Sequence, residues 1–123
     1  MTLWDSNQPI YLQLRQLVAQ RILRGDLPEE QPIPSVRQVA ADERINPLTV
    51  SRAYQLLVDE GLLEKRRGLG MFVLPGAQAR ALEQERSRFK EREWPKVIAR
   101  IQQLGLSTDE LLALRPDDEG KRP

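Results

Sequence analysis

Two short stretches of this sequence carry side chains suited to binding a polyanion. The first places Thr49, Ser51 and Arg52 close together, and the second is a run of three consecutive cations at residues 65–67. Hydroxyl and guanidinium groups bond to phosphate oxygens, and an arginine can also pair with the edge of a guanine base. The chain has 19 basic and 18 acidic residues, a net charge of +1. A polyanionic partner is therefore indicated by local clustering and not by total charge.

The residue types needed for most catalysis are missing. There is no cysteine and no histidine, which excludes disulfides, thiolate or imidazole metal ligands, cysteine nucleophiles and every triad that uses imidazole. Asp59 and Glu60 are adjacent acids near a plausible surface, but they lie at a helix end beside Gly61 with no nucleophile or metal partner in view. We therefore expect no catalytic residue, no metal site and no cofactor.

Length and composition are those of an ordinary globular protein of about one domain. The chain has 123 residues, of which 40% are hydrophobic and 30% charged. Its unbroken apolar stretches, such as residues 71–74, are far shorter than the roughly 20 residues that span a bilayer. Residues 1–7 lack the basic, apolar and small-residue order of a signal peptide. We expect a cytoplasmic protein with no membrane partner.

The polyanion-binding side chains need helices to position them, and apolar periodicity predicts these. The first helix spans residues 9–24 with its apolar side chains on one face. A proline-rich loop at residues 26–34, with room for one short edge strand, leads to the second helix. That helix begins with a capping box of Ser35 and Gln38 and ends at about residue 42 or 43.

A third helix carries most of the clustered side chains. Asn46 is its N-cap, Pro47 occupies the first helical position, and Gly61 is its stop. Its apolar face consists of Val50, Ala53, Tyr54 and Leu57. Because Tyr54 shares this face, we expect it to lie in the core. The opposite face presents Leu48 and Arg52, and an exposed leucine beside an arginine is unusual for a surface without a function.

Two short strands follow, at residues 62–65 and 70–74, joined by a basic, glycine-bearing tip. Three helices followed by such a hairpin are the order of a winged helix-turn-helix. In that fold one helix enters the major groove of DNA, the helix before it crosses the backbone, and the wing can enter the minor groove. We predict a mainly α (α+β) fold with a winged helix-turn-helix head.

The composition changes abruptly after Pro75-Gly76 to Ala, Glu, Gln and Arg. We place a domain boundary there. The expected organisation is a DNA-binding head at residues 1–75, a two-helix dimerisation tail at residues 76–115 and a frayed C-terminus at residues 116–123.

The tail is predicted to be one long helix or two shorter ones, followed by a last short helix after the capping box that begins at Ser107. Pro95 predicts a kink or break near residues 92–94, because proline removes a helical hydrogen bond. The apolar stripe is too narrow to form a core alone, so it must pack on the head, on a second copy, or both. We predict a symmetric homodimer through Leu82, Phe89, Trp94, Val97, Ile101, Leu104, Leu111 and Leu112.

Six motifs occur in order between residues 9 and 74. They are Pro9-Ile10-Tyr11-Leu12-Gln13-Leu14, Gly25-Asp26-Leu27, Pro34-Ser35-Val36-Arg37, Asn46-Pro47-Leu48-Thr49-Val50-Ser51-Arg52-Ala53-Tyr54, Glu60-Gly61-Leu62 and Arg67-Gly68-Leu69-Gly70-Met71-Phe72-Val73. Together they resemble the DNA-binding head of the GntR family of bacterial transcription regulators. The short tail with Leu104-Gly105-Leu106-Ser107 resembles the YtrA-like branch, whose members carry a brief two-helix dimerisation region.

The resemblance implies roles for individual residues. The DNA backbone would be contacted by Ser35 and Arg37, the recognition helix would begin with Asn46, Leu48, Thr49, Ser51 and Arg52, and the wing tip would be Arg67 and Gly68, with Arg44 and Arg66 as further candidates. The residue chemistry agrees with these roles. Arg52 can reach a guanine edge, and Leu48 can pack on a thymine methyl group.

Two departures from the family pattern concern packing and charge. Glu29-Glu30 stands where Pro-Gly is usual, which leaves the geometry of that loop open and adds negative charge near DNA. Glu43-Arg44 stands where an apolar residue is common at the first position, so part of the head is expected to be packed more loosely, while Arg44 adds a cation at the turn.

We expect a transcription regulator, a repressor that binds an inverted-repeat operator in double-stranded DNA as a homodimer and is nucleoid-associated when bound. Two-fold symmetry predicts half-sites about one helical turn apart, and the resemblance implies GT and AC steps within them. A small-molecule effector is compatible with the sequence but not implied by it. The alternative is a winged-helix protein-interaction module without sequence-specific DNA binding.

Overall fold

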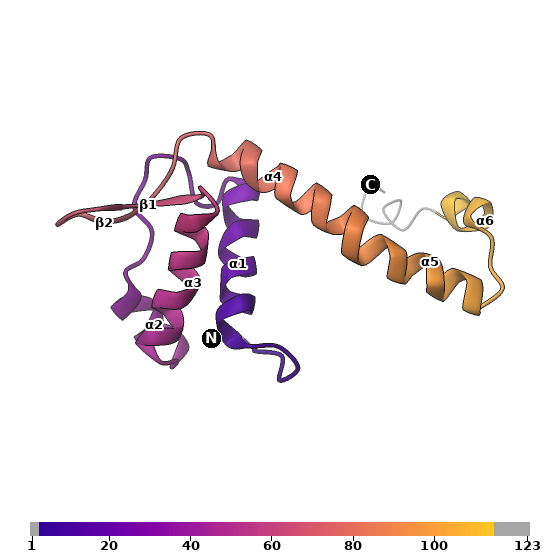
Figure 1. The fold of residues 1–123 in the computed structure, drawn as a ribbon, viewed down its shortest axis with the longest axis horizontal. Helices are drawn as coiled ribbons and strands as arrows, with labels where there is room; N and C mark the ends of the chain where they lie inside the picture. Colours follow the sequence, from indigo (N-terminus) through magenta and orange to yellow (C-terminus); the bar gives the residue numbers. More distant parts are fainter. Residues whose placement is uncertain (1–2, 115–123) are drawn as a thin grey trace, which may run out of the picture. The chain divides into compact units, whose positions relative to one another are not determined.

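The computed structural model describes residues 3–114, so the end of the predicted tail and the predicted frayed C-terminus at 116–123 lie outside the described residues. The elements are α1 (Ile10–Arg24), α2 (Val36–Glu43), α3 (Pro47–Asp59), β1 (Leu63–Arg66), β2 (Gly70–Val73), α4 (Ala77–Arg88), the π-helix η1 (Phe89–Glu93), α5 (Trp94–Gln103) and α6 (Thr108–Ala113) (Figure 1). Contacts divide the chain into two compact units, Met1–Gln84 and Glu85–Pro123. The predicted winged helix-turn-helix followed by helices is confirmed.

The core of the first unit forms where α1 packs against α3, which lie side by side in Figure 1. Tyr54, Val50 and Leu57 of α3 are buried, as are Leu14 and Ile22 of α1. These are the faces that the apolar periodicity predicts. Burial of these side chains removes apolar area from water and so fixes the orientation of α3 about its own axis.

Caps define where α2 and α3 begin. The Ser35 hydroxyl accepts a 3.1 Å hydrogen bond from the Gln38 amide, but the return bond from the Gln38 side chain is not formed. The Asn46 side chain accepts a 2.9 Å hydrogen bond from the Leu48 amide, and Pro47 occupies the first turn. Each cap satisfies an amide that has no partner inside its helix.

The hairpin is antiparallel, with Leu63 opposite Val73 and Arg66 opposite Gly70. The expected edge strand of the proline-rich loop is a single bridge between Pro32 and Phe72. Ile33 strengthens it by donating its amide to the Met71 carbonyl at 2.9 Å. The loop therefore covers the outer edge of β2.

The first turns of α4 pack on the first unit. Ala77 and Ala81 are fully buried there, and Arg80 donates a 2.7 Å hydrogen bond to the Gly61 carbonyl. The Gln84 side chain donates to the Glu60 carbonyl at 3.2 Å. Because of these contacts, the first compact unit extends past the change in composition after Pro75-Gly76 and ends at Gln84.

An ion pair joins α1 to the end of α3. An Arg15 guanidinium nitrogen lies 2.7 Å from a Glu60 carboxylate oxygen, and only 13% of the Arg15 side chain is exposed. Partial burial reduces the screening of this pair by water. The pair holds α1 against the C-terminal end of α3.

The second unit has an exposed surface throughout its described part. None of residues 85–114 is buried. The backbone does not break before Pro95 but continues through a π-helical turn, in which the Trp94 amide donates to the Phe89 carbonyl five residues earlier. The wider turn keeps the backbone helical up to the residue whose N–H is missing. The predicted capping box of Ser107 and Glu110 is formed.

In the part of the chain that the structure describes, no helix combines the length and the apolar character needed to cross a membrane.

Candidate nucleic-acid interface

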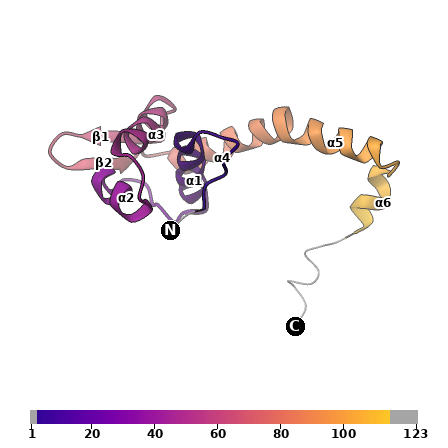
Figure 2. The ribbon, with the colours of Figure 1, turned by 90° about the horizontal axis from the view of Figure 1, so that it is seen from below.

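The first unit presents α2, the start of α3 and the hairpin at its surface. Figures 1 and 2 both show the hairpin projecting from the head on the side where α2 lies. Except for the half-buried Thr49 and Arg66, the predicted DNA-binding residues are exposed. The same core packing that buries one face of α3 therefore leaves its other face open.

The open face of α3 begins with an apolar side chain. Leu48 is 76% exposed, whereas Val50 two residues later is fully buried. Ser51 lies beside it on the exposed surface, and Gln55 is held by a 2.9 Å hydrogen bond to Asp59. An exposed leucine next to hydroxyl and guanidinium groups suits a surface that meets both the methyl groups and the polar edges of bases.

Arg52 is held by an aromatic ring. The central carbon of its guanidinium group lies 3.7 Å from the ring centroid of Tyr11 in α1. The sequence patterns predict no role for Tyr11. The two residues are far apart in the chain, and neither periodicity nor motif spacing reports a contact between different helices.

Three further predicted cations are exposed on this surface, two of them in or next to α2 and one on the hairpin. Arg37 is in α2, Arg44 ends α2 and Arg67 is at the wing tip. None of the three forms an ion pair with another described residue. Arg44 has a φ of 56°, in the left-handed region, and so makes the sharp turn between α2 and α3. Unpaired cations on one surface create a positive potential suited to phosphates.

The hairpin separates two arginines that are adjacent in sequence. Arg66 lies in β1, where its guanidinium group stacks on Phe72 at 4.2 Å and pairs with Glu64 at 3.2 Å. Arg67 begins the turn, and Gly68 has a φ of 76° with nothing within 4 Å of where a Cβ would lie. Leu69, for which the sequence predicts no role, is 70% exposed there.

The acids considered for catalysis have structural contacts. Asp59 accepts the hydrogen bond from Gln55, and Glu60 pairs with Arg15. Within residues 3–114 there is no cluster of three acidic side chains able to hold a metal ion.

The two departures from the family pattern have local consequences. The Glu29 carboxylate accepts hydrogen bonds from the amides of Gly76 at 2.8 Å and Gln78 at 3.1 Å, and these bonds lower its pKa. Glu29 thus caps the N-terminus of α4. Glu30 has a φ of 64°, the conformation for which glycine is suited. Glu43 lines a small cavity of about 110 Å³ between α1 and α2.

The second unit carries the predicted dimerisation residues on its surface, except for Leu82, which is exposed on the first unit. Ile101 and Leu111 are half-buried, and the exposed members in the second unit are Phe89, Trp94, Val97, Leu104 and Leu112. The rings of Phe89 and Trp94 lie 6.3 Å apart across η1. Ile98, half-buried on the same face of α5, was not among the predicted residues.

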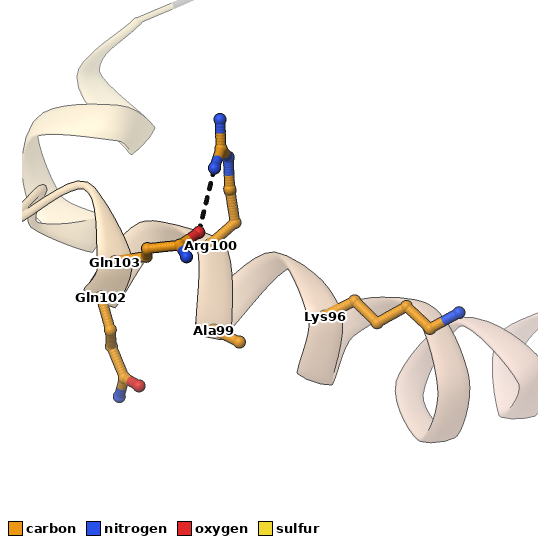
Figure 3. Close-up of a pocket in the computed structure, with 5 residues that line it drawn as sticks. All are labelled: Lys96, Ala99, Arg100, Gln102 and Gln103. Atoms are coloured by element: carbon orange, nitrogen blue, oxygen red, sulfur yellow. Dashed lines mark hydrogen bonds between the residues drawn. The ribbon is translucent and has the colours of Figure 1, made fainter.

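The other face of α5 is polar. Lys96, Ala99, Arg100, Gln102 and Gln103 all project from this one helix, and Arg100 donates a 2.9 Å hydrogen bond to Gln103 (Figure 3). Because a single helix supplies every side chain, this hollow has no opposite wall and does not enclose a ligand.

Comparison with known proteins agrees with this geometry. Residues 10–73 match the model of the family described as bacterial regulatory proteins, gntR family. An uncharacterized HTH-type transcriptional regulator of Bacillus subtilis, YhcF, is 29% identical over 89% of this chain and 88% of its own. The HTH-type transcriptional repressor YtrA of the same organism is 36% identical over 70% of this chain and 66% of its own. A GntR family transcriptional regulator from Listeria monocytogenes superposes with a TM-score of 0.74 at 25% identity, over 89% of this chain and 95% of that one.

The family match spans the three helices and the hairpin that build the exposed surface. The relatives are transcription regulators and not enzymes, which confirms the prediction of a non-catalytic regulator. The chain belongs to the GntR family of bacterial regulatory proteins, which are DNA-binding transcription regulators.

Proposed function

We propose that this chain is a repressor that binds an inverted-repeat operator as a homodimer. The observation that carries the proposal is the joint exposure of Arg37, Leu48, Arg52 and Arg67 on α2, α3 and the wing of one compact unit. A helix with exposed base-reading residues, flanked by cations from other elements, has the arrangement needed to dock into a groove while holding the phosphates on either side.

The start of α3 would supply direct readout in the major groove. Arg52 would donate to the O6 and N7 atoms of a guanine, and Leu48 would pack on a thymine methyl group. Thr49 and Ser51 would bond to phosphate or base. Asn46 already uses its side-chain oxygen to cap α3, which leaves its two amide hydrogens for DNA.

Backbone contacts would come from the elements around α3. The exposed N-terminal turn of α2, capped by Ser35, offers amides to a phosphate, and Arg37 adds a positive charge beside them. Arg44 would hold a phosphate at the turn. Such contacts set the register of the protein on the duplex and make binding sensitive to salt.

The wing would reach the minor groove through Arg67 and Gly68. Glycine at this turn lets the backbone approach closely, and an arginine is attracted to the negative potential of a narrow minor groove. Arg66 would contribute less, because its charge is already paired with Glu64.

Dimerisation would bury the apolar stripe of the second unit. None of its described residues is buried within the chain. Because Trp94, Val97 and Leu104 are exposed to water on one helical segment, we expect a partner to cover them. A two-fold dimer would place two heads on two half-sites about one helical turn apart. We place the chain in the short-tailed, YtrA-like branch, and any effector would bind at the dimer interface.

Selection of binding sites from a randomised duplex pool at about 150 mM salt tests this function, because nonspecific phosphate binding fades with salt while specific readout persists. We expect a two-fold symmetric site to be enriched by the native chain and not by Arg52→Ala. Enrichment of an asymmetric site would contradict the dimer. Failure of folded protein to enrich any site would favour the protein-interaction alternative. A reporter gene placed behind the selected site then tests repression.

A further inference from the structure

The stacked pair of Arg52 and Tyr11 lies at the junction between the helix that meets DNA and the helix behind it. Arg52 is exposed on α3, and Tyr11 is half-buried in the first turn of α1. The guanidinium carbon is 3.7 Å from the ring centroid, which is van der Waals contact. Across residues 3–114, Arg52 has no ion pair and no hydrogen bond. The ring of Tyr11 is therefore what holds this guanidinium group.

A guanidinium group that is stacked face-on keeps its hydrogen-bonding capacity. Its five N–H donors lie in the plane of the group, whereas the ring covers one face of that plane. The aromatic face attracts the cation without using any donor. Stacking thus restricts the rotamers of a long side chain while leaving the donor edge free for two parallel bonds.

This arrangement matters because an arginine in solution is flexible. Ordering such a side chain on binding costs conformational entropy, and a contact that orders it beforehand removes part of that cost. The two acceptors of guanine in the major groove, O6 and N7, need a guanidinium edge of fixed orientation. A phosphate also accepts two parallel bonds from an arginine, but such a contact does not distinguish one base pair from another.

We infer that Tyr11 is a positioning residue for base recognition: its ring holds the Arg52 guanidinium group in the orientation that donates to O6 and N7 of one guanine. The inference rests on the proposed function and adds a specificity role for a residue of α1. The ring supplies the effect and the hydroxyl does not, since the Tyr11 hydroxyl forms no hydrogen bond within the described chain. If Tyr11 only packed α1 against its neighbours, replacing it would not change the recognition of one particular base pair.

The test measures equilibrium binding, by fluorescence anisotropy, of the native chain and of Tyr11→Phe, Tyr11→Leu, Arg52→Ala and the double variant Tyr11→Leu/Arg52→Ala. Each is titrated with the selected operator, with the operator carrying 7-deazaguanine at the position that Arg52 reads, and with an unrelated duplex. Tyr11→Phe keeps the ring and is the matched control. Thermal unfolding checks that each variant is folded.

We expect Tyr11→Phe to bind like the native chain and Tyr11→Leu to lose about 3- to 10-fold in operator affinity. The loss should be smaller on the 7-deazaguanine operator, which lacks N7 but keeps O6, and should vanish in the Arg52→Ala background. The slope of affinity against salt should not change, because no phosphate contact is lost. An equal loss with and without Arg52, or an equal loss in Tyr11→Phe, would overturn the inference.

A spectroscopic measurement keeps the inference testable if Tyr11→Leu is unstable. The Arg52 side-chain N–H resonance of the native chain should be shifted upfield by the ring current, retained in Tyr11→Phe and lost in Tyr11→Met. Absence of that shift in the native chain would refute the stack itself. If the native chain selects no operator, the proposed function and this inference both fail. If the native chain selects an operator and Tyr11→Leu binds that operator equally well, only this inference fails.

Discussion

The Tyr54 hydroxyl donates a 2.7 Å hydrogen bond to the carbonyl oxygen of Pro34. Tyr54 belongs to the buried face of α3, and Pro34 precedes the residue that caps α2. One buried phenol therefore joins α3 to the start of α2. The relative placement of α2 and α3, on which the whole exposed surface depends, is fixed in part by this bond.

Tyr54→Phe removes the bond and keeps the ring. We expect the free energy of unfolding to fall by about 1 kcal/mol, because a buried hydrogen bond of this kind contributes about that much and the Pro34 carbonyl is left without the donor. Urea unfolding at neutral pH measures the change. Tyr11→Phe, which removes a hydroxyl without a hydrogen bond in the described chain, is the control, and an equal loss in both variants would contradict the assignment.

Tyr54 also predicts a loss of stability at alkaline pH. Burial raises the pKa of Tyr54 to about 12, against a usual value of 10.0. Between these values the folded protein keeps a proton that the unfolded chain releases, so the stability contribution is complete below pH 10.0 and is lost as the pH rises toward 12. Urea unfolding from pH 9 to about 12 should show a steeper decline for the native chain than for Tyr54→Phe. If the free energy of unfolding fell equally in the native chain and in Tyr54→Phe, the raised pKa of Tyr54 would not be the cause.

Glu29 predicts the opposite pH dependence. The amides of Gly76 and Gln78 hold the pKa of the Glu29 carboxyl below its usual 4.5. The ionised carboxylate therefore stabilises the folded state above pH 4.5, and this contribution is lost as the pH falls through the lowered pKa. Glu29→Gln should lower the melting temperature at pH 7, and the difference from the native chain should shrink in acid. Glu30→Gln is the matched control and should leave the pH 7 value unchanged.

Local signals account for most of what the sequence predicts. Asn46 and Pro47 mark the start of α3, because a cap and a missing N–H act within one turn. Contacts between distant residues were not predictable. Glu29 lies 47 positions before Gly76, whose amide it accepts, and the unusual Glu29-Glu30 pair indicated a changed loop without indicating what it would contact.

Pro95 shows a different limit. Its missing N–H correctly indicated a disturbed helix, but it did not indicate that the chain would stay helical through a π-helical turn. Composition likewise located the start of α4 at residue 77 but not the packing of Ala81, which depends on the surface that the head offers.

Replacing Arg66 and replacing Arg67, the two arginines of the wing, should have different effects on DNA binding. Arg67→Ala should weaken binding to all sequences and reduce the slope of log affinity against log salt by about 1, because a phosphate or minor-groove cation is lost. Arg66→Ala should change the slope less, because Glu64 already pairs with that charge. It should instead destabilise the hairpin, since its stack on Phe72 is lost. Titrations at several salt concentrations, with thermal unfolding of each variant, distinguish the two. Equal slopes would contradict the assignment.

The apolar face of α5 gives a direct test of dimerisation. Val97→Glu places a carboxylate on that face, and its burial without a partner should weaken self-association roughly 100-fold or more. Ala99→Glu adds the same group on the polar face shown in Figure 3 and should have no such effect. Sedimentation equilibrium measures both. Because each head folds around its own core, Val97→Glu should still bind a single half-site weakly, while losing the gain in affinity from two linked half-sites. A monomeric Ala99→Glu, or a dimeric Val97→Glu, would mean that the interface lies elsewhere on the chain.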